Sequence, residues 1–387
     1  MTLAGFDQSQ RRAAAVVALE TAIAQTHGSG EALASDSNLS NKWLADDFAA
    51  KAPGIDWRAF FAAARLSSVK QIVVWQPRAI AGGASLVASE PLETWKDYLR
   101  FHVIEHYADV LPKLIAERAR EFHGVRLGDA RWIAPRAQRA LDSANVSLLD
   151  AIGKMYVENY SPQAQRAKVR EIASNVIHAF GRRIKAAPWL TPPAKLMAME
   201  KLHTLYFGVG YPEHWIDYSG LKIDPADALA NFRRVEAWNY QQALSRLAKP
   251  ADFTEWHLAA HTVGASSFPF QNAYNFCAGL LQPPKFDPQA SDAANYGAIG
   301  AIIGHEVSHF FDDSGASYDS LGRPLKWWSS TDAKQFEAAT APLAEQYSGY
   351  RPLPDLPIDG KLTLSESVAD LGGLVAAFDA YRSTLGS

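Results

Sequence analysis

Two histidines and a glutamate stand close together in the segment HEVSH, residues 305–309. Residues four positions apart share one face of a helix, so His305 and His309 direct two imidazole rings at one metal ion. Glu306 is turned away from that axis by one residue, close enough to meet a water molecule on the metal. These residue types at this spacing predict a metal site with an adjacent carboxylate base.

The spacing H-E-x-x-H is typical of zinc peptidases, in which the glutamate acts as general base. The simpler alternative is a helix that contains an ordinary core histidine and no metal. Small residues and isoleucines precede the motif, and they include Gly297, Gly300 and Gly304. Each glycine weakens an isolated helix by about 1 kcal/mol. We therefore expect this helix to be buried and closely packed by its neighbours.

A catalytic zinc site needs a third protein ligand, and a later segment supplies candidates. In ESVAD, Glu366 and Asp370 are four residues apart and share a helix face. Enough chain separates His305 from Glu366 to cross over and return, so we predict Glu366 as the third ligand. Without HEVSH, both acids would be explained by a solvated helix start, where the helix dipole favours negative charge.

Histidine ligands usually donate their second N–H group to an acceptor, which fixes the ring orientation. Asp370 is expected to accept this bond from one histidine. Asp312, three residues after His309, is expected to accept it from the other. The alternative for Asp312 is an acidic residue of the turn FDDSG that plays no part in metal binding.

The composition is that of a globular protein large enough for two or three domains, with 387 residues, 48% hydrophobic and 20% charged. A net charge of −3 gives no electrostatic reason to expect nucleic acid or an anionic membrane as partner. No apolar run approaches about 18 residues, so we expect no membrane span. No signal peptide is visible at the start. One cysteine, Cys277, excludes an internal disulfide framework without fixing the compartment.

The elements around the motif indicate a mainly α fold with a small β component (α+β). Residues 1–210 form a mostly helical lobe, and residues 211–387 form the lobe that carries the motif, with a joint near 208–212. Helical spacing and capping signals predict helices over 1–30, 91–122 with a break near residue 112, 134–160, 162–186, 191–206, 225–248, 331–347 and 365–381. Short strands are predicted at 262–270 and 274–281, and a short extended piece at 360–364.

Four motifs resemble the neprilysin and endothelin-converting-enzyme family of zinc metallopeptidases, which includes bacterial oligopeptidases. They are, in order, AGLLQPPKFD, NYGAIGAIIGHEVSHFFDDSG, WW and GKLTLSESVADLGGL. The resemblance implies a helical lobe that caps a thermolysin-like catalytic lobe, and short peptides as substrates. It implies one Zn²⁺ per chain, held by the ligands His305, His309 and Glu366, with Glu306 as catalytic base, Asp370 orienting His305 and Asp312 orienting His309. It also implies a periplasmic or extracellular location.

The sequence departs from the family pattern in three respects. An Asn-Ala pair that holds the substrate backbone in the family falls on Gly264 and Ala265, while Asn272-Ala273 is out of register. Ser367 stands where the family commonly has asparagine. The chain is expected to be truncated at both ends, without a C-terminal segment that carries a histidine and an arginine for the oxyanion. Losing one oxyanion donor costs about 10²–10³ in rate.

Two functions follow. The first is a zinc endopeptidase or oligopeptidase that cleaves short peptides through a water activated by Glu306. The second is a truncated or degenerate member that binds zinc, with or without peptide, and does little or no catalysis. A variant of the second is a fragment completed by a partner chain that supplies the C-terminal segment. A metal-dependent hydrolase of other substrates is a distant third, because nothing in the sequence points to phosphate, sugar or nucleotide.

Overall fold

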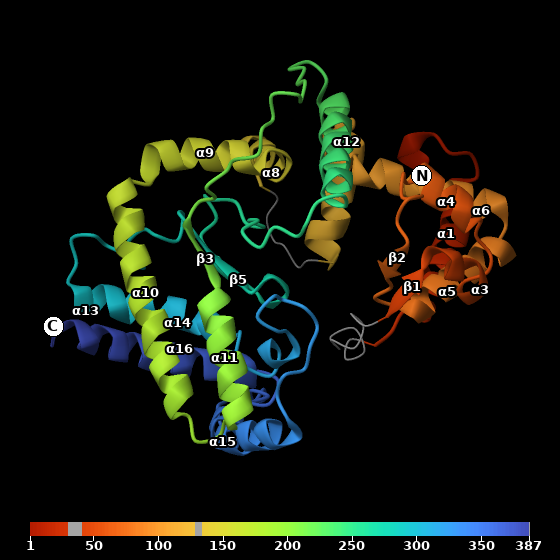
Figure 1. The fold of residues 1–387 in the computed structure, drawn as a ribbon. Helices are drawn as coiled ribbons and strands as arrows, with labels where there is room; N and C mark the ends of the chain where they lie inside the picture. Colours follow the sequence, from red (N-terminus) through yellow and green to blue (C-terminus); the bar gives the residue numbers. More distant parts are fainter. Residues whose placement is uncertain (30–40, 128–133, 387) are drawn as a thin grey trace. The chain divides into compact units, whose positions relative to one another are not determined.

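The computed structural model describes residues 1–29, 41–127 and 134–386 (Figure 1). Helices dominate these residues and the few strands are short, which confirms the predicted mainly α fold with a small β component. Backbone contacts divide the chain into two units. The first comprises Met1–Asp142 and Ser219–Pro250, and the second Ser143–Tyr218 and Ala251–Ser387. The division into lobes 1–210 and 211–387 stays a prediction.

The first unit is a helical assembly with a small aromatic core. Its longer helices are α1 (Ser9–Thr26), α4 (Trp57–Ala63), α5 (Pro77–Ser89), α6 (Leu92–His106), α7 (Lys113–Arg120) and α12 (Ala228–Arg246), and β1 (Lys42–Leu44) pairs antiparallel with β2 (Gln71–Val73). Trp43, Phe48, Trp57 and Phe61 are buried together. The Asp56 carboxylate caps α4 by accepting from the Ala59 N–H at 2.9 Å.

Three local predictions differ from the structure. The single helix predicted at 134–160 is two helices, α8 (Arg136–Ser147) and α9 (Leu149–Tyr160). Helix α5 was not predicted, because two glycines, which disfavour helix, stand in its interior at Gly82 and Gly83. The extended piece predicted at 360–364 is wrong, because these residues form turns that lead into α16 (Leu364–Thr384).

The second unit contains a three-stranded sheet in the order β3-β5-β4. Strand β3 (Tyr206–Gly210) runs parallel to β5 (Ala273–Cys277), and β4 (Ala265–Phe268) runs antiparallel to β5. The two predicted strands correspond to β4 and β5, whereas β3 was not predicted. Every residue of β5 is buried, and β4 lies at an edge of the sheet.

The second unit contains the helix that carries HEVSH and several longer helices of the chain. Its helices include α9, α10 (Gln163–Ala186), α11 (Pro192–Thr204), α13 (Asp292–Asn295), α14 (Ala301–Ser308), α15 (Ser330–Ser348) and α16. A π-helical turn, Tyr296–Gly300, joins α13 to α14. Helix α14 contacts both α10 and α16 and contributes to the main hydrophobic core. The expectation of a buried helix for the motif is therefore confirmed.

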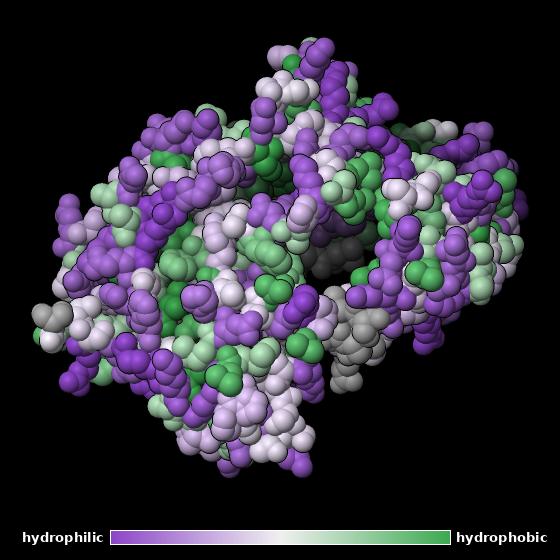
Figure 2. All heavy atoms as spheres, in the orientation of Figure 1, coloured by the Kyte–Doolittle hydropathy of each residue, from purple (hydrophilic) through white to green (hydrophobic). Residues whose placement is uncertain are grey.

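The visible surface in Figure 2 is mostly hydrophilic, with separate hydrophobic areas. One row of exposed apolar side chains lies on α16, and its members are Leu371, Leu374 and Phe378. Among residues 1–29, 41–127 and 134–386, no helix is both long enough and apolar enough to cross a membrane.

Candidate metal centre

The two histidines lie at the C-terminal end of α14 and face each other. His305 belongs to the last turn of the helix and His309 directly follows it, still with helical backbone angles. Their Nε2 atoms are 3.2 Å apart. Each Nδ1 atom contacts a carboxylate, which can only accept a hydrogen bond, so each Nδ1 carries the proton. Two Nε2 lone pairs therefore point at one small space.

Helix α16 brings Glu366 to the same space. Its Oε2 atom lies 3.3 Å from His305 Nε2, and its Oε1 atom lies 3.7 Å from His309 Nε2. The approach depends on two glycines, because a Cβ at Gly304 would lie 2.5 Å from the Gly373 carbonyl oxygen. A larger residue at either position would push α14 and α16 apart.

The separations of the three donor groups fit a tetrahedral zinc ion. With bonds of about 2.0–2.1 Å, two ligand atoms of a tetrahedral site lie about 3.3–3.4 Å apart. The two Nε2 atoms are 3.2 Å apart and Glu366 Oε2 lies 3.3 Å from His305 Nε2, both close to this value. The other carboxylate oxygen, Oε1, lies 3.7 Å from His309 Nε2. No other arrangement of three such groups within 4.8 Å of one another occurs in the part of the chain that the structure describes. Two imidazoles and a carboxylate are also the ligand types that zinc prefers.

Both predicted carboxylate partners contact the histidines. Asp370 accepts from His305 Nδ1 at 2.8 Å, and Asp312 accepts from His309 Nδ1 at 2.9 Å. Asp370 is largely exposed, whereas only 2% of the Asp312 surface is accessible.

Asp312 also holds the start of α16, through Ser365, which the sequence indicated only as the start of that helix. Ser365 Oγ donates to Asp312 Oδ2 at 2.8 Å, and the Gly315 N–H donates to Asp312 Oδ1 at 2.9 Å. Because Ser365 directly precedes Glu366, one buried carboxylate restrains two of the three candidate ligands. The only sequence signal for Ser365 was its position before Glu366 at a helix start.

Glu306 projects from the same helix turn into a partly buried position near the sheet. Burial raises the pKa of the Glu306 carboxyl above its usual range, against the opposing effects of His305, His309 and the Ser267 hydroxyl on β4. Burial lowers the pKa of His309, but the hydrogen bond to Asp312 and the negative charges of Asp312, Glu366 and Glu306 together raise it above its usual value. A carboxylate with a raised pKa beside a metal site is suited to accept and return a proton near neutral pH.

The two residues at the family's substrate-positioning register lie at the edge strand. Ala265 begins β4, and the carbonyl of Gly264 accepts from the Cys277 N–H at 3.2 Å. Asn272 lies after β4 with a left-handed backbone, and its amide donates within the fold, to the Lys201 carbonyl and Thr204 Oγ1. The buried Asn272 amide therefore makes hydrogen bonds inside the fold and is not presented to a substrate.

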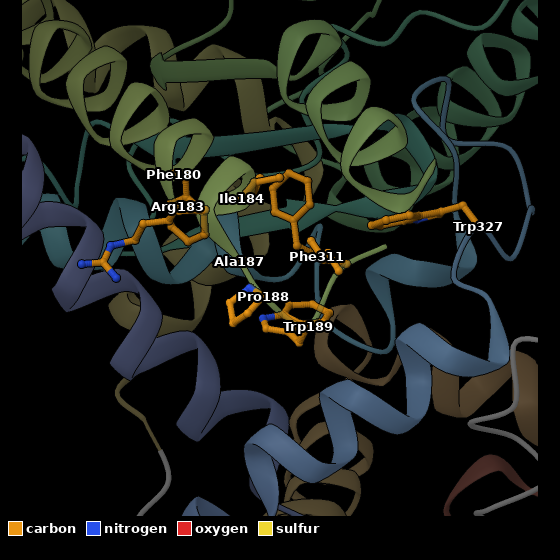
Figure 3. A pocket seen from close by; sticks show the side chains of 10 residues that line it. Phe180, Arg183, Ile184, Ala187, Pro188, Trp189, Phe311 and Trp327 are labelled. Atoms are coloured by element: carbon orange, nitrogen blue, oxygen red, sulfur yellow. The ribbon is translucent and has the colours of Figure 1, made fainter. Parts of the chain in front are cut away.

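An apolar pocket of about 370 Å³ lies beyond the end of α14 (Figure 3). Phe180, Ile184, Trp189, Phe311 and Trp327 are among the side chains that line it. None of the residues that line it is a candidate metal ligand.

Replacing Asp312 by asparagine is expected to weaken zinc binding by about 10–100-fold, because the amide is a poorer acceptor for His309 and presents no charge. Competition with a chelating dye measures the affinity. Asp355→Asn, an exposed carboxylate in the loop between α15 and α16, is the matched control. Equal affinities for both variants and the parent would contradict the role of Asp312.

Comparison with known proteins finds one peptidase family along most of the chain. Sequence profiles of Peptidase family M13 match residues 1–212 and 268–387. Neutral endopeptidase of Lactobacillus helveticus is 30% identical over 339 residues, which cover 87% of this chain and 52% of that protein. Neprilysin-11 of Caenorhabditis elegans is 28% identical, over 90% of this chain and 43% of that protein. The chain spans about half the length of such relatives.

Solved structures show the same fold. The zinc metalloprotease ZMP1 of Mycobacterium tuberculosis, in complex with an inhibitor, superposes with a TM-score of 0.88 at 35% identity, covering 97% of this chain and 58% of that chain. PEPO of Lactobacillus rhamnosis gives a TM-score of 0.88 at 26% identity, over 99% of this chain and 60% of that chain. The resemblance inferred from the four motifs is confirmed, and the chain belongs to Peptidase family M13.

Proposed function

We propose that this chain belongs to a zinc-dependent peptidase that hydrolyses peptide bonds of short peptides. The observation that carries the proposal is the convergence of His305 Nε2, His309 Nε2 and the Glu366 carboxylate at separations suited to tetrahedral zinc, next to Glu306. A zinc ion bound there would lower the pKa of its water ligand toward about 7 and polarise the peptide carbonyl.

Glu306 acts as general base and then as general acid. Its carboxylate takes a proton from the attacking water and passes it to the leaving amine. Burial supports this role because it raises the pKa of Glu306 toward working pH. Asp370 and Asp312 each accept a hydrogen bond from the protonated Nδ1 of one histidine. The Nε2 atoms of both histidines are therefore unprotonated and free to bind metal.

The substrate backbone is proposed to add to the edge strand β4, where Ala265 offers its backbone groups. Gly264 supplies no side-chain amide for a second contact, so the peptide is held there by backbone bonds. Peptide substrates are an inference from family membership. A periplasmic or extracellular location is a further proposal from the resemblance, and cell fractionation tests it.

Gly264→Asn is expected to strengthen peptide binding. The position has room, because a Cβ would meet only a Thr262 methyl group at 3.5 Å, and the backbone angles are ordinary. One added hydrogen bond contributes about 1 kcal/mol, or a KM about fivefold lower at similar kcat. Steady-state kinetics measure this, with the exposed Gly220→Asn as control. An unchanged KM would argue against strand addition at this register.

A second function, zinc binding with little or no turnover by this chain alone, is favoured by one observation. Helix α16, which carries Glu366, exposes Leu371, Leu374 and Phe378. In this case a partner polypeptide would complete the site. A quenched-fluorescence peptide assay with zinc content measured in parallel separates the two functions. One zinc per chain with cleavage supports the first, and one zinc without cleavage supports the second.

A further inference from the structure

Lys201, on α11, places an ammonium group inside the protein, where charged side chains are rare. The residue is fully buried, with 0% of its surface accessible. Its Nζ donates to the carbonyl oxygens of Gly315 and Tyr318, at 2.6 and 2.7 Å. Burial lowers its pKa to about 8, despite the opposing charges of Asp312 and Asp319. A buried ammonium usually costs folding stability compared with an apolar side chain of the same shape, so packing alone does not favour lysine here.

The two carbonyl acceptors belong to the loop that leaves the metal helix. Gly315 lies directly against the end of that helix, since a Cβ there would be 2.4 Å from the His309 carbonyl oxygen. The N–H of Gly315 donates to Asp312, and its carbonyl accepts from both Lys201 and Trp327 Nε1. Gly315 is therefore the link between Lys201 and the buried carboxylate.

Asp312 passes this restraint to two candidate ligands. Its Oδ2 atom accepts from His309 Nδ1 and from Ser365 Oγ, and Ser365 directly precedes Glu366. The positive charge of Lys201 also opposes the cost of burying the Asp312 carboxylate. A continuous series of hydrogen bonds thus runs from α11, through the loop, to the metal helix and to α16.

We propose that Lys201 is a positioning residue for the metal centre, holding the loop at 312–318 so that Asp312 keeps His309 and Glu366 in register. The inference rests on the proposed zinc site. Lys201 itself touches neither the candidate ligands nor the substrate, and it acts through Gly315 and Asp312.

The test compares zinc affinity in Lys201→Met and in a matched control on the same helix, Lys195→Met. Lys195 is half-buried, and its Nζ donates to the Lys185 carbonyl at 2.9 Å. Chelator competition is expected to show about 10–100-fold weaker zinc binding for Lys201→Met and parent affinity for the control. The visible spectrum of the Co²⁺-loaded chain should change as well, because it reports ligand geometry. An unchanged affinity and spectrum for Lys201→Met would overturn the proposal.

A double-mutant cycle separates positioning from a general loss of packing. If Lys201 acts through Asp312, adding Lys201→Met to Asp312→Asn lowers zinc affinity little beyond Asp312→Asn alone. Losses that multiply would contradict that route. The melting temperature of each metal-free variant is measured in parallel, so that affinities are compared between folded proteins.

Trp327→Phe carries the test if Lys201→Met does not fold. It removes the second donor to the Gly315 carbonyl and keeps an aromatic wall for the pocket in Figure 3. The expected loss of zinc affinity is about fivefold, and parent affinity in this variant would overturn the proposal. A parent chain that binds no zinc would instead refute the metal centre itself, which distinguishes the two failures.

Discussion

Glu306→Gln is expected to keep its zinc and to lose peptide cleavage by about 10²–10⁴-fold, the usual contribution of a general base. Glutamine has nearly the same shape as glutamate but cannot take a proton from water at neutral pH. Glu306 lies beside the candidate ligands without being one of them, so the metal should remain bound. The measurements are kcat/KM with a quenched peptide and zinc content on the same sample.

Glu337→Gln is the matched control for this experiment. Glu337 is an exposed glutamate on α15, outside the metal centre, and its substitution should leave both zinc content and rate unchanged. Cleavage by Glu306→Gln at the parent rate would show that another group activates the water. Loss of zinc from the same variant would show that Glu306 binds the metal.

Glu366→Ala is expected to weaken zinc binding more than ~100-fold. This exceeds the effect of removing a carboxylate that only hydrogen-bonds a metal ligand. The alanine variant leaves only two imidazoles, whereas zinc sites in peptidases use three protein ligands. The Glu366 side chain is 69% exposed, so its removal should barely change the stability of the metal-free chain. Loss of metal and loss of folding are therefore separable in this variant.

Chelator competition measures the affinity of Glu366→Ala, and thermal unfolding without metal measures its stability. Glu345→Ala, on the exposed surface of α15, is the control and should bind zinc like the parent. If Glu366→Ala bound zinc as tightly as the parent, the third ligand would have to be another group.

Much of the site could be predicted because its information is local. The spacing of His305 and His309 fixes their common face before any tertiary contact forms. Glu366 and Asp370 obey the same rule on α16, and the requirement for a third ligand links the two helices. The structure brings these groups together at the separations described above.

The parts that were not predicted depend on tertiary packing. Ser365 and Lys201 reach Asp312 and its loop from α16 and α11, and nothing in their local sequence indicates a partner so far along the chain. Strand β3 was missed because its five residues, YFGVG, include two glycines, and its pairing with β5 gives it strand geometry. The close approach at Gly304 and Gly373 likewise requires both helices to be in place.

Anomalous diffraction at the zinc absorption edge, from crystals of the zinc-loaded chain, tests the central claim most directly. We predict one peak per chain, within about 2.0–2.2 Å of His305 Nε2, His309 Nε2 and a Glu366 carboxylate oxygen. A peak at another position, or one bound by the histidines while Glu366 points into solvent, would contradict the proposed metal centre.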